Sequence, residues 1–310
     1  MRDRGAGCDC GPRSGERAVS SVRAPSALVD YYQLTKPRII VLLLITTLAA
    51  MIMAAHGLPP LGLTLATLIG GALAAGSAGA FNCVIDRDID ALMTRTAARP
   101  LPTGRIGLGA AIVFATLLGV AAFALFYFVV NPLAAWLSLA GNLYYVVVYT
   151  MWLKRATYWN IVIGGAAGAV PPLVGWAAVT HSVGLPALGL FALIFLWTPP
   201  HFWALALMAN TDYERAKIPM LPNVHGVHRT KVEIFVYTLL MVGMSLALTP
   251  LGVMGLWYFV PAAVLGAVFI YDAWQMLHGP TKPLARITFK YSLLYLALMC
   301  AAMVADRVLG

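Results

Sequence analysis

Nine long apolar runs determine what this chain can fold into. Each is about 17 to 25 residues long, the length that a helix needs to cross the hydrocarbon core of a bilayer. Because backbone polar groups cannot stay unpaired in lipid, runs this long and this continuous are expected to form helices. The predicted fold class is therefore all-α, a polytopic membrane protein with nine transmembrane helices. The expected spans are residues 39–56, 61–81, 108–130, 134–153, 161–180, 186–209, 233–254, 257–274 and 289–305, of which the last is the shortest.

The composition supports a membrane protein and excludes other classes. Apolar residues make up 61% of the chain and charged residues only 11%, whereas a soluble domain carries about 25% charged residues. A soluble enzyme, a disordered protein and a nucleic-acid-binding protein are excluded, because the net charge of +9 comes from few charges. The four cysteines show no spacing typical of a disulfide framework or a zinc site.

The basic residues predict the orientation of the spans. Of the 21 lysines and arginines, all but Arg307 lie before the first span or in every second loop. Since cytoplasmic loops collect basic residues, we expect a multi-pass protein of the plasma (inner) membrane with a cytoplasmic amino terminus. Residues 1–28 are polar and are expected to form a disordered cytoplasmic tail that includes Cys8 and Cys10. Residues 29–310 are expected to form the transmembrane domain.

An acidic triplet follows the second span. Asn82, Asp86 and Asp90 are spaced at i, i+4 and i+8, so a helix that extends past the membrane surface would present all three on one side. Carboxylate and amide oxygens are ligands that Mg²⁺ prefers, and such a site leaves positions open for phosphate. The alternative is a solvated helix end whose acids pair with nearby arginines.

Basic residues close to the triplet favour a phosphate ligand. Arg95 and Arg99 follow the acids in the same loop, and mixed acids and guanidinium groups suit a polyphosphate whose charge metal and arginine share. At a membrane surface this combination indicates a diphosphate on a lipid-soluble tail. A second acidic patch contains Asp212 and Glu214, which are two residues apart and cannot present both carboxylates on one helix face. We expect Asp212 to be the functional acid and Glu214 a surface residue.

The segment 80–101 resembles the first aspartate-rich motif, N-x-x-x-D-x-x-x-D, of the intramembrane aromatic prenyltransferases. Within that superfamily the chain is most similar to the branch that farnesylates haem, and the likeness covers about residues 30 to 305. The further segments that carry it are Leu34-Thr35-Lys36-Pro37-Arg38, Tyr149-Thr150 with Leu153-Lys154-Arg155, residues 160–165, residues 197–203, and Asp212-Tyr213 with residues 218–222.

The resemblance implies a bundle of two four-helix halves plus one helix around a central cavity, capped by two acidic cytoplasmic loops. It implies transfer of a farnesyl group from farnesyl diphosphate to the vinyl group of protohaem IX, followed by water addition. Haem is then a substrate and Mg²⁺ is the cofactor. The product, haem O, would pass to haem A biosynthesis for terminal oxidases, so a haem A synthase is a possible partner.

Carried over residue by residue, the motif assigns the metal and the diphosphate to named side chains. Asn82, Asp86, Asp90 and Asp212 are expected to hold Mg²⁺, with Lys154, Arg95 and Arg99 adding positive charge. The chain departs from the wider pattern in two ways: Ala216 stands where a second carboxylate is common, and Tyr149 and Lys154 are five residues apart instead of four. The second departure leaves the role of Tyr149 open.

Residues for the haem substrate are less specific in the sequence. His201 follows Pro199 and Pro200, so it either faces haem or bonds a carbonyl that the prolines free. Lys36, Arg38 and Arg155 either bind the haem propionates or simply anchor the loops at the cytoplasmic face. His225 and His228 are expected in a solvated loop before the seventh span.

Two other functions fit the same pattern. One is prenyl transfer to the aromatic ring of a quinone precursor, and the other is a non-catalytic carrier of haem or a polyprenyl lipid. A carrier would not release diphosphate, which separates it from both enzymes.

Overall fold

The computed structural model describes residues 26–309, so the predicted tail up to residue 25, with Cys8 and Cys10, lies outside it. Nine helices of the described part are long and apolar enough to cross a membrane, as predicted. The single α-helices among them are α2 (Pro37–Ala55), α3 (Leu61–Ile85), α8 (Asn160–Thr180), α9 (Leu185–Met208), α11 (Leu221–Ala247), α12 (Leu256–His278) and α13 (Thr281–Leu309). The third span joins α5 (Leu108–Leu125) to the π-helix η1 (Phe126–Val130), and the fourth joins α6 (Pro132–Leu143), the π-helix η2 (Tyr144–Leu153) and α7 (Lys154–Ala156).

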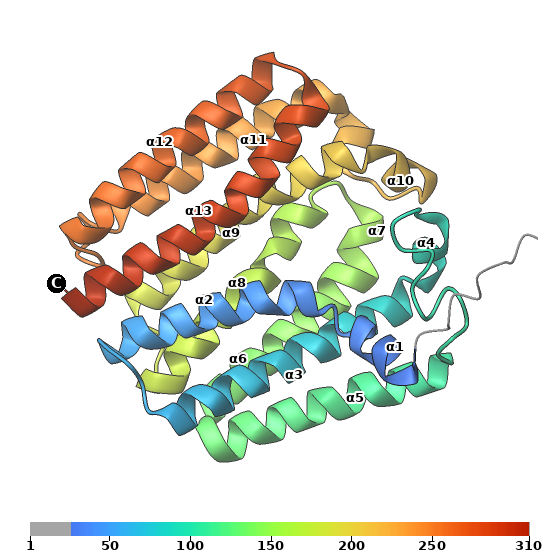
Figure 1. Cartoon of the computed structure of the whole chain (residues 1–310), viewed down its shortest axis with the longest axis horizontal. Coiled ribbons are helices and arrows are strands. Elements are labelled where there is room, and N and C mark those ends of the chain that lie inside the picture. The colour runs from blue at the N-terminus through green and yellow to red at the C-terminus, as the bar shows by residue number, and fades with distance from the viewer. Residues whose placement is uncertain (1–25, 310) are drawn as a thin grey trace, which may run out of the picture.

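The spans form one bundle in which α2 and α8 lie between two groups of helices (Figure 1). α3, α5 and α6 lie on one side, and α9, α11, α12 and α13 lie on the other. α2 and α8 approach closely because Gly175 faces the backbone carbonyl of Thr47, where even a Cβ would collide. In lipid no hydrophobic driving force holds helices together. Small residues allow the backbones to approach closely, and the resulting van der Waals packing stabilises the pair.

Three short helices lie at one end of the bundle: α1 (Ala27–Leu34), α4 (Arg87–Leu92) and α10 (Asn210–Arg215). The end of α13 lies at the opposite end (Figure 1). An odd number of spans has this consequence. The two acidic loops share one end of the bundle because four spans, an even number, lie between them.

Two helices extend beyond the expected spans. The last span is no short helix: α13 has 29 residues, the most of any helix in the described part. α11 already begins at Leu221, with a kink at Gly226 (φ 81°), so His225 and His228 are exposed helical residues and do not lie in a loop. In both helices the polar first turns extend beyond the apolar run, because backbone hydrogen bonds can continue where hydropathy ends.

Candidate active site

The acidic triplet does not lie on one continuous helix, as its spacing predicted. α3 ends at Ile85, Asp86 has non-helical backbone angles (φ −89°, ψ 8°) and α4 begins at Arg87. The break frees the carbonyl of Ile85, which accepts a hydrogen bond from Arg155 (3.0 Å). Nevertheless Asn82, Asp86 and Asp90 are all buried, with 4%, 1% and 3% of their surface exposed. The helix end is therefore not solvated, although Asp90 does pair with a nearby arginine, Arg99, as the alternative also expected.

A cation from another segment contacts each member of the triplet. Lys154 Nζ lies 2.5 Å from Asp86 Oδ2, and Arg99 Nη1 lies 2.7 Å from Asp90 Oδ2. Lys36 donates to Asn82 Oδ1. Such partners are required, because an unpaired charge that is removed from water loses several kcal/mol of hydration. The structure thus brings together six of the residues that the sequence singled out.

Lys36 has a strained backbone at the junction of α1 and α2. Its φ and ψ are both 57°, the left-handed region, although Pro37 follows, and this conformation costs a non-glycine residue about 1–2 kcal/mol. Burial lowers the pKa of the Lys36 ammonium group, with nearby charges acting in both directions. Strain of this kind is typical of functional sites, where surrounding contacts keep a side chain in place.

One oxygen of Asp86 has no partner. Oδ1 is buried and accepts no hydrogen bond from the described residues, and Arg155 Nη2 approaches it only to 4.0 Å. A buried, unsatisfied carboxylate oxygen destabilises the fold, and a cation would relieve that cost. The described residues do not gather three carboxylate, histidine or cysteine side chains into a ready-made metal cage. Since Mg²⁺ is commonly held by one or two carboxylates and by substrate phosphates, the donors of the triplet fit this ion.

The fourth span contacts the triplet through its π-helix η2. Thr150 Oγ1 donates to the carbonyl of Tyr145, five residues earlier (2.8 Å), and accepts from Asn82 Nδ2 (3.1 Å). In a π-helix, residues five apart occupy successive turns on one face. Tyr149 and Lys154 are therefore placed on a common face despite their spacing, and the ring of Tyr149 lies against Gly164 of α8.

Asp212 connects the two acidic loops. On α10, its carboxylate accepts hydrogen bonds from the backbone N–H groups of Thr94 (3.2 Å) and Arg95 (3.4 Å). Burial opposes ionisation of this carboxyl group, but the hydrogen bonds from Thr94 and Arg95 outweigh it and lower the pKa of Asp212. Glu214 on the same helix is exposed, as expected. Asp212 therefore holds the loop that carries Arg95 and Arg99 in place.

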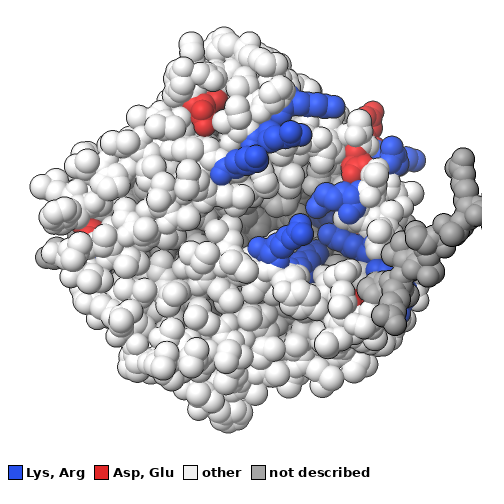
Figure 2. Space-filling model, in the orientation of Figure 1, with Lys and Arg blue, Asp and Glu red and all other residues white. Residues whose placement is uncertain are grey.

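The other predicted cations lie further out. Arg155 forms a bidentate pair with Asp88 (2.8 and 2.9 Å), and its guanidinium group lowers the pKa of that carboxyl group. Arg38 and Arg95 are exposed. Figure 2 shows lysine and arginine side chains gathered around a hollow in this face of the molecule. A ring of positive charge around a concave surface is suited to draw in an anionic ligand.

His201 is embedded in aromatic side chains on α9. Its ring stacks on Trp197 (4.3 Å between centroids) and on Phe289 (4.7 Å), and Nδ1 lies 2.7 Å from Ser292 Oγ. The hydroxyl of Ser292 on α13 is thus its hydrogen-bond partner, and not a carbonyl that the two prolines free.

A comparison with protein families identifies the family of this chain. Residues 43–299 match the model described as the UbiA prenyltransferase family. The chain belongs to this family. It is therefore an integral, multi-pass membrane protein and an intramembrane prenyltransferase. The resemblance seen in the aspartate-rich motif is confirmed.

Curated relatives within the family are similar over almost their whole length. The chain is 55% identical to the "Protoheme IX farnesyltransferase" of Gloeobacter violaceus, covering 94% of this chain and 96% of the relative. It is 54% identical to the protein of the same name from Picosynechococcus, covering 91% and 90%.

Solved structures of other proteins share the fold. A digeranylgeranylglyceryl phosphate synthase superposes with a TM-score of 0.76 at 19% identity, covering 91% of this chain and 99% of that one. A UbiA homologue from Archaeoglobus fulgidus, bound to DMAPP and Mg²⁺, gives a TM-score of 0.64 at 15% identity, covering 88% and 99%. The predicted nine-helix architecture is confirmed.

The sequence did not identify Thr150 as part of the site. Its hydroxyl is fully buried between Asn82 and the carbonyl of Tyr145. A threonine inside an apolar run is unremarkable in a sequence, and nothing in the residue types marks the π-helix that directs its side chain.

Proposed function

We propose that this chain transfers the farnesyl group of farnesyl diphosphate to a vinyl group of protohaem IX, giving haem O and diphosphate. The observation that carries this proposal is the buried Asn82–Asp86–Asp90 cluster with Lys36, Lys154 and Arg99 around it. The relatives named for the same reaction, at 54–55% identity, support the choice of donor and acceptor.

The protein's own cations act on the leaving group. The allylic C–O bond of the donor breaks, and its electron pair leaves with the diphosphate oxygen. In the described structure Lys154 and Arg99 neutralise Asp86 and Asp90; they would turn to the phosphate oxygens as negative charge builds there. Interactions that strengthen as charge develops lower the barrier selectively. Arg95 adds charge from the exposed edge of the same loop.

Mg²⁺ would be held by Asn82, Asp86, Asp90 and Asp212, and when bound it supplies further charge neutralisation of the diphosphate. The orphaned Oδ1 of Asp86 supports this assignment. The A. fulgidus homologue bound to DMAPP and Mg²⁺ is a precedent for such a pairing within the fold.

Transfer to the haem requires a cavity without water while the farnesyl cation exists, and one water molecule after the new C–C bond has formed. The vinyl carbon of haem forms a bond to the farnesyl C1, the positive charge moves to the adjacent carbon, and water adds there and loses a proton to solvent. Tyr145 and Tyr149, whose ring centroids lie 5.4 Å apart, are placed to shield the cation. We assign His201 to contact with the porphyrin, and Arg38, with Lys36 and Arg155 nearby, to its propionates.

Mass spectrometry tests the proposal directly. Purified protein in nanodiscs is incubated with protohaem, farnesyl diphosphate and Mg²⁺, and the extracted haems are analysed. We expect a haem that has gained a farnesyl group and one water. Prenylation of an added quinone precursor with no change in haem would instead indicate the first alternative function, and ligand binding without diphosphate release would indicate a carrier.

We further propose that the acidic loops face the cytoplasm of a bacterial inner membrane. The end of the bundle that carries α1, α4 and α10 also carries most of the basic residues. Haem O would then be released near the cytoplasmic leaflet to the enzyme that consumes it, for which a haem A synthase is the expected partner. Reporter fusions to the loops would test the orientation, and co-purification would test the partner.

A further inference from the structure

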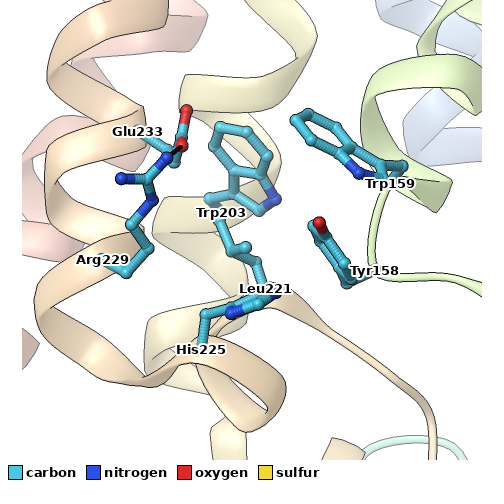
Figure 3. A pocket seen from close by; sticks show the side chains of 7 residues that line it. All are labelled: Tyr158, Trp159, Trp203, Leu221, His225, Arg229 and Glu233. Carbon is cyan, nitrogen blue, oxygen red and sulfur yellow. Dashed lines mark ion pairs between the residues drawn. The ribbon is translucent and has the colours of Figure 1, made fainter.

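A second pocket, of about 410 Å³, lies at the same end of the bundle, away from the acidic triplet. Tyr158 and Trp159 line it from the turn before α8, Trp203 from the second half of α9, and His225 from the start of α11 (Figure 3). Trp203 packs in the same apolar cluster as Ile89 of α4. None of the three triplet residues lines this pocket.

The pocket contains hydrogen-bond donors that lack a protein acceptor. Trp203 is 1% exposed, and its Nε1–H has no partner among the described residues. In Figure 3 the indole nitrogen of Trp203 and the hydroxyl of Tyr158 lie on the sides of their rings that face each other. A buried indole N–H without an acceptor is costly. The arrangement thus suits a ligand that supplies acceptor oxygens.

The charge of the pocket restricts the ligand further. Arg229 and Glu233, one turn apart on α11, neutralise each other at 2.5 Å. No uncompensated cation of the described lining residues is therefore available for a multiply charged soluble phosphate. A single phosphodiester, which carries one negative charge and several acceptor oxygens, fits the neutral donors better.

The surface next to the pocket is apolar. Arg229, Glu233, Val236 and Leu240 follow one another at helical spacing along one face of α11, and Val236 and Leu240 are exposed. Tyrosine and tryptophan at the ends of membrane spans lie where headgroups meet acyl chains. A ligand with a polar head in the pocket would have its chains beside these side chains.

We propose that this pocket binds the phosphodiester headgroup of a membrane glycerophospholipid, with Trp203 and Tyr158 donating to its phosphate oxygens and the apolar face of α11 contacting an acyl chain. Because Trp203 belongs to the same apolar cluster as Ile89 of α4, a bound lipid would stabilise the packing behind the acidic loop. This site is separate from the proposed site of prenyl transfer. A result that disproves lipid binding here would therefore not disprove the proposed prenyl transfer, and the reverse also holds.

Native mass spectrometry of the delipidated, full-length protein tests the site, with phosphatidylethanolamine added in steps. Trp203→Phe and Tyr158→Phe each remove one donor and keep the ring. We expect each to weaken the tightest lipid-binding step by about tenfold, as for loss of one hydrogen bond to a charged acceptor. Trp274→Phe, an exposed tryptophan on α12, is the matched control, and melting curves in detergent establish that all variants are folded.

Three results would overturn the proposal. The first is a lipid affinity in folded Tyr158→Phe and Trp203→Phe that equals that of Trp274→Phe. The second is equal competition by glycerophosphoethanolamine, which lacks acyl chains and would indicate a soluble phosphoester. The third is displacement of the lipid by protohaem in a Trp203-dependent manner, which would make the pocket an acceptor site.

Discussion

Two buried aspartates at opposite ends of the bundle are satisfied in different ways. Asp306, near the end of α13, accepts hydrogen bonds from the backbone N–H groups of Gly255 (2.7 Å) and Tyr258 (3.1 Å) at the start of α12, so both of its oxygens are occupied. Asp86 has one oxygen bonded by Lys154 and Asn82 and the other without a partner.

The difference distinguishes a structural acid from a functional one. Backbone donors at a helix start cannot move away, so Asp306 acts as a cap for α12. Side-chain cations can be exchanged for other ligands, and an unsatisfied oxygen leaves room for one. Burial alone does not separate the two aspartates, since 6% of Asp306 and 1% of Asp86 are exposed.

Removal of the Asp86 carboxylate is the strongest test of this contrast. We expect Asp86→Ala to lower turnover by about 10³-fold or more, because a charge-stabilising group of the active site is lost, while the protein still accumulates in the membrane. Product haem and released diphosphate are measured at saturating Mg²⁺. Glu214→Gln, in the exposed acid of the other loop, is the matched control. Substantial activity of Asp86→Ala under these conditions contradicts the assignment.

Lys154→Gln removes the cation that holds Asp86. We expect about a 10²-fold lower kcat with a smaller change in KM for farnesyl diphosphate, because the ammonium group acts mainly on charge that develops in the transition state. Steady-state kinetics of diphosphate release provide the measurement. Lys154→Arg keeps the charge and is expected to recover part of the loss; no recovery would argue that shape, and not charge, matters here.

Thr150→Val tests how sharply the π-helix positions the cluster. The substitution keeps the volume but removes the hydroxyl between Asn82 and the Tyr145 carbonyl, and we expect about a tenfold loss of activity, equivalent to one hydrogen bond of about 1.4 kcal/mol. Thr150→Ser retains the hydroxyl and is expected to stay near the wild-type rate. Equal losses in both variants would point to packing of the γ-methyl group.

Asp306→Asn is expected to change stability and leave turnover as it is. Replacing one acceptor oxygen by an amide group at the start of α12 costs about 1–3 kcal/mol. A lower Tm in detergent with unchanged kcat at a temperature below unfolding is the expected result. A variant that melts normally but turns over slowly would remove the distinction between the two aspartates.

Much of the fold could be predicted from the sequence, because lipid imposes a simple rule on backbone hydrogen bonds. All nine spans were predicted, but hydropathy placed the last one at 289–305 whereas α13 begins at Thr281. Lys282 and Arg286 precede the apolar run but are part of the helix. A hydropathy scan ends the predicted span where charged residues begin, whereas the helix continues as long as its backbone hydrogen bonds do.

The candidate site was predicted by its residue types and not by its geometry. The acids and most of the cations around them were recognisable from spacing and from the motif. The break at Asp86 and the partners of each acid arise from contacts between segments that lie far apart in sequence, 68 residues for Lys154 and Asp86 and 118 residues for Thr94 and Asp212. Local spacing contains no information on such contacts.

The wide turn of η2 makes this span tolerant of a change in length. A single-residue deletion between Tyr149 and Lys154 would let the segment wind as an ordinary α-helix, in which residues four apart again share a face. A tyrosine and a lysine four apart on an α-helix, or five apart on a π-helix, thus share a face in the same way. The difference of one residue between the two spacings is accommodated within the membrane-spanning helix itself, because the π-helical turns of η2 are wider than α-helical turns.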